Sequence, residues 1–209
     1  MHRVTAQLLK KPFADQKSEE WLNKRKQMLT ASDAAAALKP NIKDLLLRKC
    51  GHREFHGNTA TRHGEFYEDE ARDVYEKTYS TKVYEFGLCE HPEHQWLGGS
   101  PDGVTIDGIL LEIKCPYSRI PTDSVPPQYY PQLQVCMEVL DLEMAHFVEY
   151  IPECHGNYVF QMIRVPRDRE WFKSNLPKLK QSWEQIRICQ EDNSQLPDSR
   201  VKKGYLFID

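Results

Sequence analysis

The stretch that decides the fold is GGSPDGVTIDGILLEIKCP, residues 98–116. Its Asp107-Gly108 pair lies between two apolar runs, a pattern typical of a β-hairpin. Side chains alternate between the two faces of a strand, so Glu112 and Lys114 in the second run point to the same side. Apolar residues surround both, and burying charged groups without partners is costly. These two charged groups therefore need partners or a function.

The length of the hairpin loop decides whether Asp102 joins this pair. A two-residue loop would place Asp102 opposite Ile113, with its side chain on the other face from Glu112. A three-residue loop that ends at Gly108 places Asp102 directly opposite Glu112, and it puts Gly108 at the left-handed position that such loops favour. We expect this three-residue loop, or a bulge just after Asp102 with the same effect.

The residues alone leave two interpretations of Asp102, Glu112 and Lys114 open. A bare Glu-x-Lys pair in a strand is compatible with an ion pair that only holds the structure together. The three residues together fit a metal site, because carboxylate oxygens are the ligands that Mg²⁺ prefers. Such an ion lowers the pKa of a bound water and stabilises charge on a phosphate, while the lysine steadies or deprotonates the water. The second carboxylate, supplied by the Pro-Asp-Gly kink, favours the metal site.

Composition limits the class of protein. The chain has 209 residues and a net charge of −3, so it is not a strongly basic DNA coat protein, although an enzyme with a local basic groove stays open. Its six cysteines form no CxxC pair, which argues against a zinc finger or an iron–sulfur nuclease and for reduced thiols. No apolar run reaches the roughly 20 residues of a membrane span, and the N-terminus does not resemble a secretory signal. We expect an intracellular protein with no membrane segment.

Beyond the hairpin, the spacing of apolar residues predicts helices and strands in a mixed order. Pro177 is expected to break or kink the last helix, and Ser32 or Asp33 to cap the second. Helices are expected at 18–27, 34–38, 42–50, 64–79, 131–140 and from 168 onward, and strands at 82–88, 96–100, 103–106, 109–115, 145–151 and 158–165. This order predicts an α/β fold in which a mixed twisted β-sheet is flanked by helices. We expect a single domain over residues 1–209, with a core at about 18–188 and a polar C-terminal tail at 190–209.

Several segments, in the same order, resemble a known family. SPDG followed by LEIKCP is similar to the phage lambda exonuclease and YqaJ-type viral recombinase family of the PD-(D/E)xK nuclease superfamily. Three more family segments have counterparts here: the Trp…Arg…Thr-Ala-Ser segment in WLNKRKQMLTASDAA (21–35), the Gly…Tyr-Glu…Ala helix in HGEFYEDEA (63–71) and the Gln-x-Gln helix in YYPQLQVCMEVL (129–140). The resemblance runs from residue 21 to about 150, and it implies a restriction-endonuclease-like core and a nuclease domain.

The resemblance implies roles for the residues of the hairpin. Asp102 and Glu112 would bind the metal, and the main-chain carbonyl of Ile113 would complete the ligand set. Lys114 would position the nucleophilic water. Glu68 would approach the metal from the long helix, through a water molecule. The family often has a further acidic residue before SPDG, and since EHPEHQWLGG offers no clean match, the number of metal ions stays open.

The resemblance also implies roles for residues outside the hairpin. Gln132 would contact the attacking water or the metal shell. We prefer it to Gln134, which shares a face with Glu138 that we expect to be solvated. Arg25 and Ser32 would hold the 5′ phosphate of a DNA end. Each residue also has a structural interpretation, such as an exposed charged face for Arg25 and a helix cap for Ser32.

The function implied by the resemblance is a metal-dependent exonuclease. It would hydrolyse linear double-stranded DNA in the 5′ to 3′ direction during viral or phage recombination and repair. Mg²⁺ would be the cofactor, and Mn²⁺ would be able to replace it. The implied partners are double-stranded DNA ends, a single-strand annealing protein and two further copies of the chain in a ring-shaped homotrimer. A structure-specific or restriction-type endonuclease of the same superfamily is the alternative, and a noncatalytic DNA-binding module is a third hypothesis.

Overall fold

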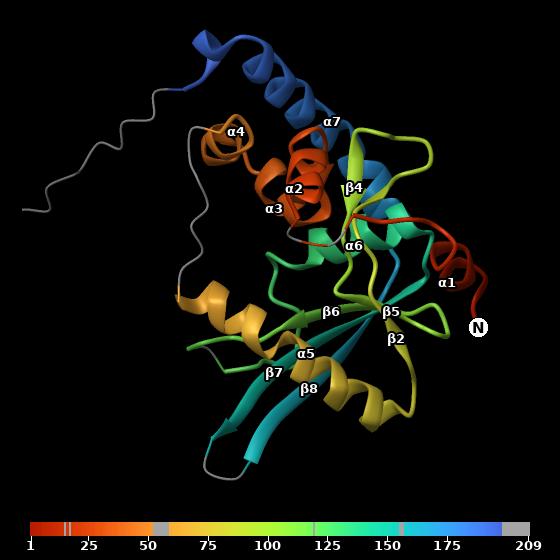
Figure 1. Cartoon of the computed structure of the whole chain (residues 1–209). Coiled ribbons are helices and arrows are strands. Elements are labelled where there is room, and N and C mark those ends of the chain that lie inside the picture. The colour runs from red at the N-terminus through yellow and green to blue at the C-terminus, as the bar shows by residue number, and fades with distance from the viewer. Residues whose placement is uncertain (15, 17, 52–58, 119, 155–156, 198–209) are drawn as a thin grey trace, which may run out of the picture.

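The structure, a computed structural model, describes residues 1–14, 16, 18–51, 59–118, 120–154 and 157–197. Within them, helices flank two mixed β-sheets (Figure 1). The predicted α/β class is confirmed, but the strands divide between two sheets where one was expected. No helix in these ranges is long and apolar enough to cross a membrane.

The larger sheet has five strands in the order β2-β5-β6-β7-β8. Their bounds are β2 Val83–Tyr84, β5 Gly103–Thr105, β6 Leu110–Lys114, β7 Met144–Cys154 and β8 Asn157–Pro166. β6 and β7 run parallel, while the other neighbours are antiparallel. The strand that carries Glu112 and Lys114 is therefore the middle strand of the sheet.

The smaller sheet has three strands in the order β1-β4-β3. They are β1 Leu29–Thr30, β4 Leu97–Gly99 and β3 Cys89–Glu90. β1 pairs with β4 in parallel, so the segment before the first alanine-rich helix lies beside the segment that leads into SPDG. The sequence analysis missed β1 and β3, because strands of two residues are too short to show an alternating pattern.

The helices lie close to their predicted places. They are α1 Arg3–Leu8, α2 Glu19–Lys26, α3 Ala34–Ala37, α4 Lys43–Lys49, α5 Thr59–Tyr79, α6 Tyr130–Leu140 and α7 Arg169–Glu191, with 3₁₀ turns η1 Ala31–Asp33 and η2 Asn193–Gln195.

The expected break at Pro177 is wrong, because α7 continues through it. Leu179 and Trp183, both buried, hold the second half of the helix on the core. α1 was not expected, and it adds Val4 and Leu8 to the core.

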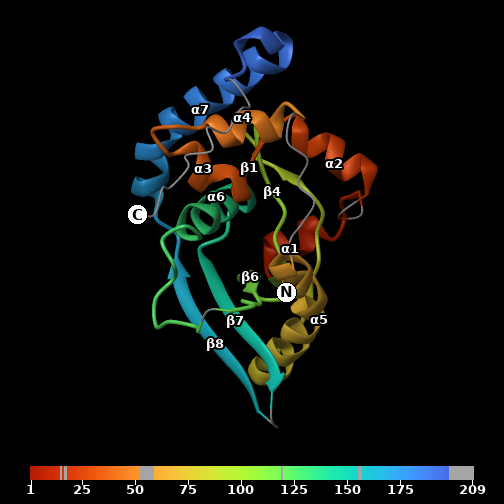
Figure 2. The same ribbon diagram turned by 90° about the vertical axis from the view of Figure 1, so that its left-hand side faces the viewer.

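Two helices cover opposite faces of the five-stranded sheet. Leu111 and Ile113 face α5, where they pack with Ala71 and Tyr75. Leu110, the neighbour of Leu111, belongs to the other core, which contains α6. Figures 1 and 2 show α5 along the lower part of the molecule and α6 between the two sheets. Since side chains alternate along β6, Glu112 and Lys114 point toward the α6 side.

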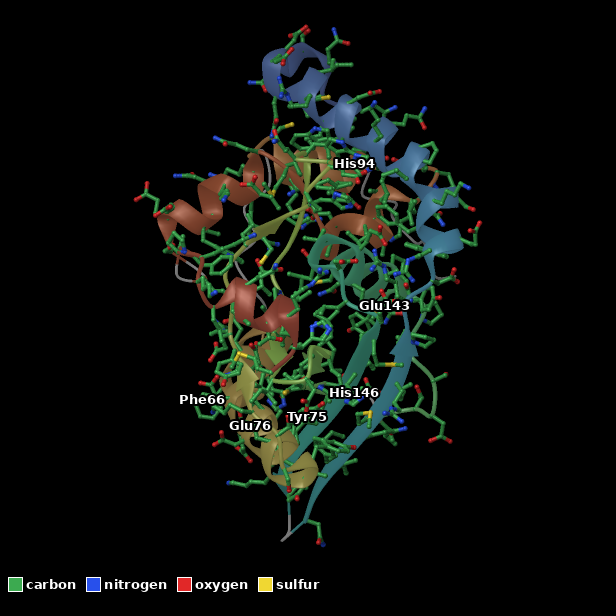
Figure 3. All side chains as sticks on the ribbon, turned by 90° about the vertical axis from the view of Figure 1, so that its right-hand side faces the viewer. Phe66, Tyr75, Glu76, His94, Glu143 and His146 are labelled. Carbon is green, nitrogen blue, oxygen red and sulfur yellow. The ribbon has the colours of Figure 1, made fainter. Side chains whose placement is uncertain are left out.

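A buried polar contact fixes α5 against the sheet. The Tyr75 hydroxyl on α5 and the Nδ1 atom of His146 on β7 lie 2.7 Å apart, and the two side chains appear together in Figure 3. Both residues are almost fully buried. Leaving a buried polar group without its hydrogen bond costs free energy, so this contact favours one position of α5 on the strands.

Candidate active site

The hairpin has the register predicted from its turn. Gly103 pairs with Leu111 and Val104 with Leu110, so continuing the ladder places Asp102 opposite Glu112. Gly108 has a φ of +80° and closes the three-residue loop through a hydrogen bond from its amide to the Thr105 carbonyl. The prediction of a three-residue loop is therefore confirmed.

Asp102 directly precedes β5, and its side chain accepts a hydrogen bond from the neighbouring strand β6. Its Oδ2 atom accepts a hydrogen bond of 2.7 Å from the Ile113 amide on β6. This bond orients the carboxylate toward the strand that carries Glu112. The side chain is partly exposed, and it lines a cavity of about 650 Å³.

Glu112 is fully buried and only half satisfied. Lys114 Nζ and Gln132 Nε2 both donate to its Oε1 atom, whereas its Oε2 atom is buried without a hydrogen bond. Burial and the nearby charge of Asp102 raise the pKa of Glu112 to about 7, even though Lys114 acts in the other direction. A buried carboxylate oxygen without a partner is unfavourable in the protein alone, and a cation beside it would satisfy it.

Lys114 is held as an ammonium group. Burial lowers its pKa, but the carboxylates of Glu112 and Asp102 outweigh burial and raise the pKa above its ordinary value. Its Nζ atom also lies 5.3 Å from the centre of the Tyr129 ring, a favourable cation–π distance. The charged form suits a hydrogen-bond donor to water or phosphate.

The residues fit a divalent cation with a small protein ligand set. Asp102 and Glu112 supply carboxylates from adjoining strands, and the Ile113 carbonyl is available from the same place in the sheet. Glu68 on α5 lines the same cavity as Asp102, and its carboxylate is 3.3 Å from the Arg72 guanidinium. Within the described part of the chain, no group of three or more acidic, histidine or cysteine side chains is placed to hold a metal ion, and the role of Glu68 stays a prediction.

Arg25 and Ser32 lie together, as the resemblance implied. The Arg25 guanidinium donates to Ser32 Oγ at 2.9 Å, and it stacks 4.3 Å above the Trp21 ring. The Trp21 indole donates in turn to Ser100 Oγ at 3.1 Å, two residues before Asp102. A direct chain of side chains therefore joins this pair to the SPDG turn.

A buried aspartate organises the basic residues around this pair. Asp33 accepts hydrogen bonds from the amide and hydroxyl of Thr30, and it forms ion pairs with Lys49 at 2.6 Å and Arg48 at 2.9 Å. Burial raises its pKa, but the two cations outweigh burial and keep the pKa below its ordinary value. Asp33 does not cap α3 with its side chain as expected, but it forms a capping box with Thr30 at the start of η1, while Ser32 accepts from Arg25.

The two glutamines of α6 have different surroundings. Gln132 contacts Glu112, as described above. Gln134 was expected to be solvated, but it is 1% exposed, accepting from the Asp168 amide at 2.7 Å and donating to the Pro166 carbonyl at 3.0 Å. The expectation failed because the start of α7 packs over that face of α6, a tertiary contact without a local signal.

Sequence reasoning missed several neighbours of the site. Tyr129, Ser100, Arg48 and Lys49 were not singled out. Tyr129 is the first residue of the matched segment 129–140, and this position could have marked its ring as a contact of the site. The others depend on β1–β4 pairing and on the packing of α4, which no short motif shows.

Comparisons with known proteins identify the family of this chain. The model of the YqaJ-like viral recombinase domain family matches residues 20–143. An uncharacterized protein of Acanthamoeba polyphaga mimivirus is 31% identical over 161 residues, which cover 66% of this chain and 29% of that protein. The chain thus spans less than a third of the length of that curated relative.

Two solved structures share the fold. The alkaline exonuclease LHK-Exo from Laribacter hongkongensis has a TM-score of 0.75 and 26% sequence identity, covering 85% of this chain and 97% of its own. A phage related exonuclease from Haemophilus somnus 129PT has a TM-score of 0.63 over 78% of this chain and 96% of its own, and at 12% identity it shows the fold alone.

The family match covers more than half of the chain, and it includes the hairpin, the Arg25–Ser32 pair, Glu68 and Gln132. This chain belongs to the YqaJ-like viral recombinase domain family.

Proposed function

We propose that the protein is a metal-dependent exonuclease that hydrolyses the phosphodiester bonds of linear double-stranded DNA. The observation that carries the proposal is the placement of Asp102 and Lys114 on the wall of one cavity, with Lys114 donating to Glu112 and one Glu112 oxygen buried and lacking a hydrogen bond. Membership of a family with exonuclease structural relatives supports the reaction class.

Asp102, Glu112 and the Ile113 carbonyl would hold the cation, which we propose to be Mg²⁺ with Mn²⁺ as a substitute. When bound, the ion supplies a water of lowered pKa and charge stabilisation at the phosphate. Lys114 donates to the attacking water or to the phosphate, and its charge stabilises the negative charge that develops there. Gln132 holds Glu112 in place by donating to its Oε1 atom, and Glu68 adds a carboxylate that lines the cavity.

Arg25 and Ser32 would bind the 5′ phosphate of the DNA end, which gives digestion in the 5′ to 3′ direction. The guanidinium offers charge-assisted hydrogen bonds, and Arg48 adds positive charge next to Asp33. LHK-Exo has been solved in complex with dAMP, and we infer that a deoxynucleotide also fits the candidate active site of this chain.

The resemblance supports the wider part of the proposal. The chain would act as a single nuclease domain on DNA ends during viral or phage recombination and repair. It would work with a single-strand annealing protein and assemble as a homotrimer around the duplex.

The test is digestion of a linear duplex, with and without a 5′ phosphate and with and without Mg²⁺. Glu112→Gln removes a metal ligand and Lys114→Ala removes the ammonium group, so each should slow digestion by roughly 10²-fold or more. Glu184→Gln and Lys180→Ala, at exposed positions on α7, are the matched controls and should digest at the wild-type rate. Undiminished digestion by either site variant would reject the assignment.

A covalently closed circular duplex separates the proposal from its alternative. An exonuclease needs an end and leaves the circle intact. Degradation of the circle at a rate comparable to the linear form would instead identify a structure-specific or restriction-type endonuclease of the same superfamily.

A further inference from the structure

An exposed tyrosine stands at the mouth of the candidate active site. Tyr117 follows Lys114 by three residues, lines the same cavity and is 60% exposed. Three residues of extended chain span at most about 10 Å, so the ring lies within one nucleotide's reach of the reacting groups.

The ring is supported from behind by other aromatic groups. The edge of His63, on α5, meets the Tyr117 ring with centroids 5.3 Å apart at 76°. His63 also packs against Tyr67 at 4.8 Å, and Tyr67 against Phe66 at 4.9 Å. Phe66 is 77% exposed and lies at the margin of the molecule in Figure 3. Tyr117 is thus the first member of an aromatic row, Tyr117–His63–Tyr67–Phe66, that begins at the cavity.

The loop that carries Tyr117 is anchored on its far side. The Thr122 amide donates to the buried Glu149 carboxylate at 3.4 Å, and Gln161 Nε2 donates to the Thr122 carbonyl at 2.9 Å. Glu149 lies on β7 directly beside Lys114 of β6, so this anchor belongs to the same part of the sheet as the site. The Tyr117 ring itself is supported by its contact with His63, and a ring supported before a ligand arrives loses less entropy on binding.

We propose that Tyr117 forms a nucleobase-stacking subsite for the nucleotide next to the hydrolysed phosphodiester, a proposal that rests on the proposed nuclease function. The ligand class is a purine or pyrimidine base unpaired at the DNA end. Every base offers a π-face, so stacking on an aromatic ring tolerates any sequence. That tolerance suits an enzyme that must digest whatever sequence follows.

The test compares Tyr117→Leu, which loses the aromatic face, with Tyr117→Phe, which keeps it. Tyr158→Leu is the matched control, because Tyr158 is 51% exposed at the start of β8, in the hairpin away from the cavity. For steady-state digestion of a linear duplex, Tyr117→Leu should raise KM about ten-fold, within the range that stacking of one base provides. Tyr117→Phe and Tyr158→Leu should leave KM unchanged.

A spectroscopic measurement reports the stacking itself. A linear duplex with 2-aminopurine as its 5′-terminal base is added with Mg²⁺ to the Lys114→Ala variant, which keeps the metal ligands and hydrolyses slowly. Stacking on Tyr117 should quench the fluorescence. Adding Tyr117→Leu to this background should abolish the quenching, and adding Tyr117→Phe should retain it.

The outcomes separate the two proposals. Normal digestion by wild type, with unchanged KM and unchanged quenching in Tyr117→Leu, overturns the stacking subsite and leaves the nuclease assignment in place. Failure of wild type to bind or digest the duplex overturns both. A change in the elution volume of Tyr117→Leu on size exclusion, without a change in quenching, would assign the ring to a contact between protein copies and also overturn the subsite.

Discussion

At the scale of single residues, two glutamines two positions apart in α6 should respond differently to truncation. Gln132→Ala removes a donor to Glu112 at the reacting centre, so it should lower kcat by roughly 10²-fold with little change in the free energy of unfolding. Gln134→Ala leaves the Asp168 amide and the Pro166 carbonyl without a partner. It should lower the free energy of unfolding by about 2 kcal/mol.

Steady-state kinetics and urea unfolding, measured on both variants, check this pair of expectations. If Gln132→Ala lowers stability and Gln134→Ala lowers kcat, the assignment of the two side chains is reversed.

Buried His146 should make the protein sensitive to mild acid. Burial and then the charge of Arg164 lower its pKa from 6.5 to about 4. The unfolded chain therefore takes up this proton at a higher pH than the folded chain, so stability is fully present above about pH 6.5 and is lost as pH falls toward 4. The free energy of unfolding falls by at most about 3 kcal/mol by pH 4.

The measurement is urea unfolding between pH 7 and pH 4.5. His146→Gln, which does not titrate and whose amide can still bond to the Tyr75 hydroxyl, should show a shallower dependence than wild type over this range. Equal slopes for the two proteins would mean that the acid sensitivity comes from other groups.

At the scale of elements, a glycine-to-alanine substitution should destabilise the protein more in the turn of the hairpin than at a helix end. Gly51 and Gly108 both have positive φ, +78° and +80°. A Cβ atom on Gly51 would meet nothing within 4 Å, whereas one on Gly108 would lie 2.3 Å from the ring of His2. Gly51→Ala should therefore lower the free energy of unfolding by about 1 kcal/mol through backbone strain, and Gly108→Ala by about 2 kcal/mol or more.

Urea unfolding of both variants checks the comparison. Adding His2→Ala to Gly108→Ala should recover the part of the loss that comes from the clash. No recovery in the double variant would show that strain alone accounts for the effect.

The same elements show what the sequence could predict. Asp107-Gly108 predicted the hairpin turn but left two loop lengths open. The three-residue loop was chosen because it puts Gly108 at the left-handed position and Asp102 opposite Glu112, and the structure has this loop. All of these residues lie close together in the chain, so the prediction could be made locally. β1 and β3 depend on partners more than fifty residues away or on strands of two residues, and no local periodicity marks them. The continuation of α7 through Pro177 similarly depends on the buried side chains that follow it.

At the scale of the whole molecule, the Trp21–Ser100 hydrogen bond joins the proposed phosphate pocket to the proposed metal site. Ser100→Ala removes the acceptor and should weaken the alignment of a substrate that uses both places. We expect digestion of a 5′-phosphorylated duplex to slow about five-fold, as for the loss of about 1 kcal/mol. Digestion of a 5′-hydroxyl duplex should change little, because it does not engage Arg25.

The ratio of kcat/KM for the two duplexes measures this coupling. Ser174→Ala, at an exposed position on α7, is the control and should keep the wild-type ratio. An equal slowing of both duplexes by Ser100→Ala would show that the bond only supports the fold.

Most residues of the candidate site were predicted from a resemblance in short segments, and not from physical reasoning about the sequence. Arg25 and Ser32 are seven residues apart and belong to α2 and η1, so a motif can contain both. Arg48, Lys49 and Tyr129 join the site through packing and were missed.

The hydrogen bond from the Ile113 amide to Asp102 has a consequence for how this protein can evolve. An asparagine offers the same acceptor oxygen without the charge, so Asp102→Asn should keep the hairpin intact while removing a proposed metal ligand. Aspartate and asparagine codons differ by a single transition. Under the proposed function, a lineage that carries this gene can therefore silence the nuclease in one mutational step and retain a folded protein free to acquire another role.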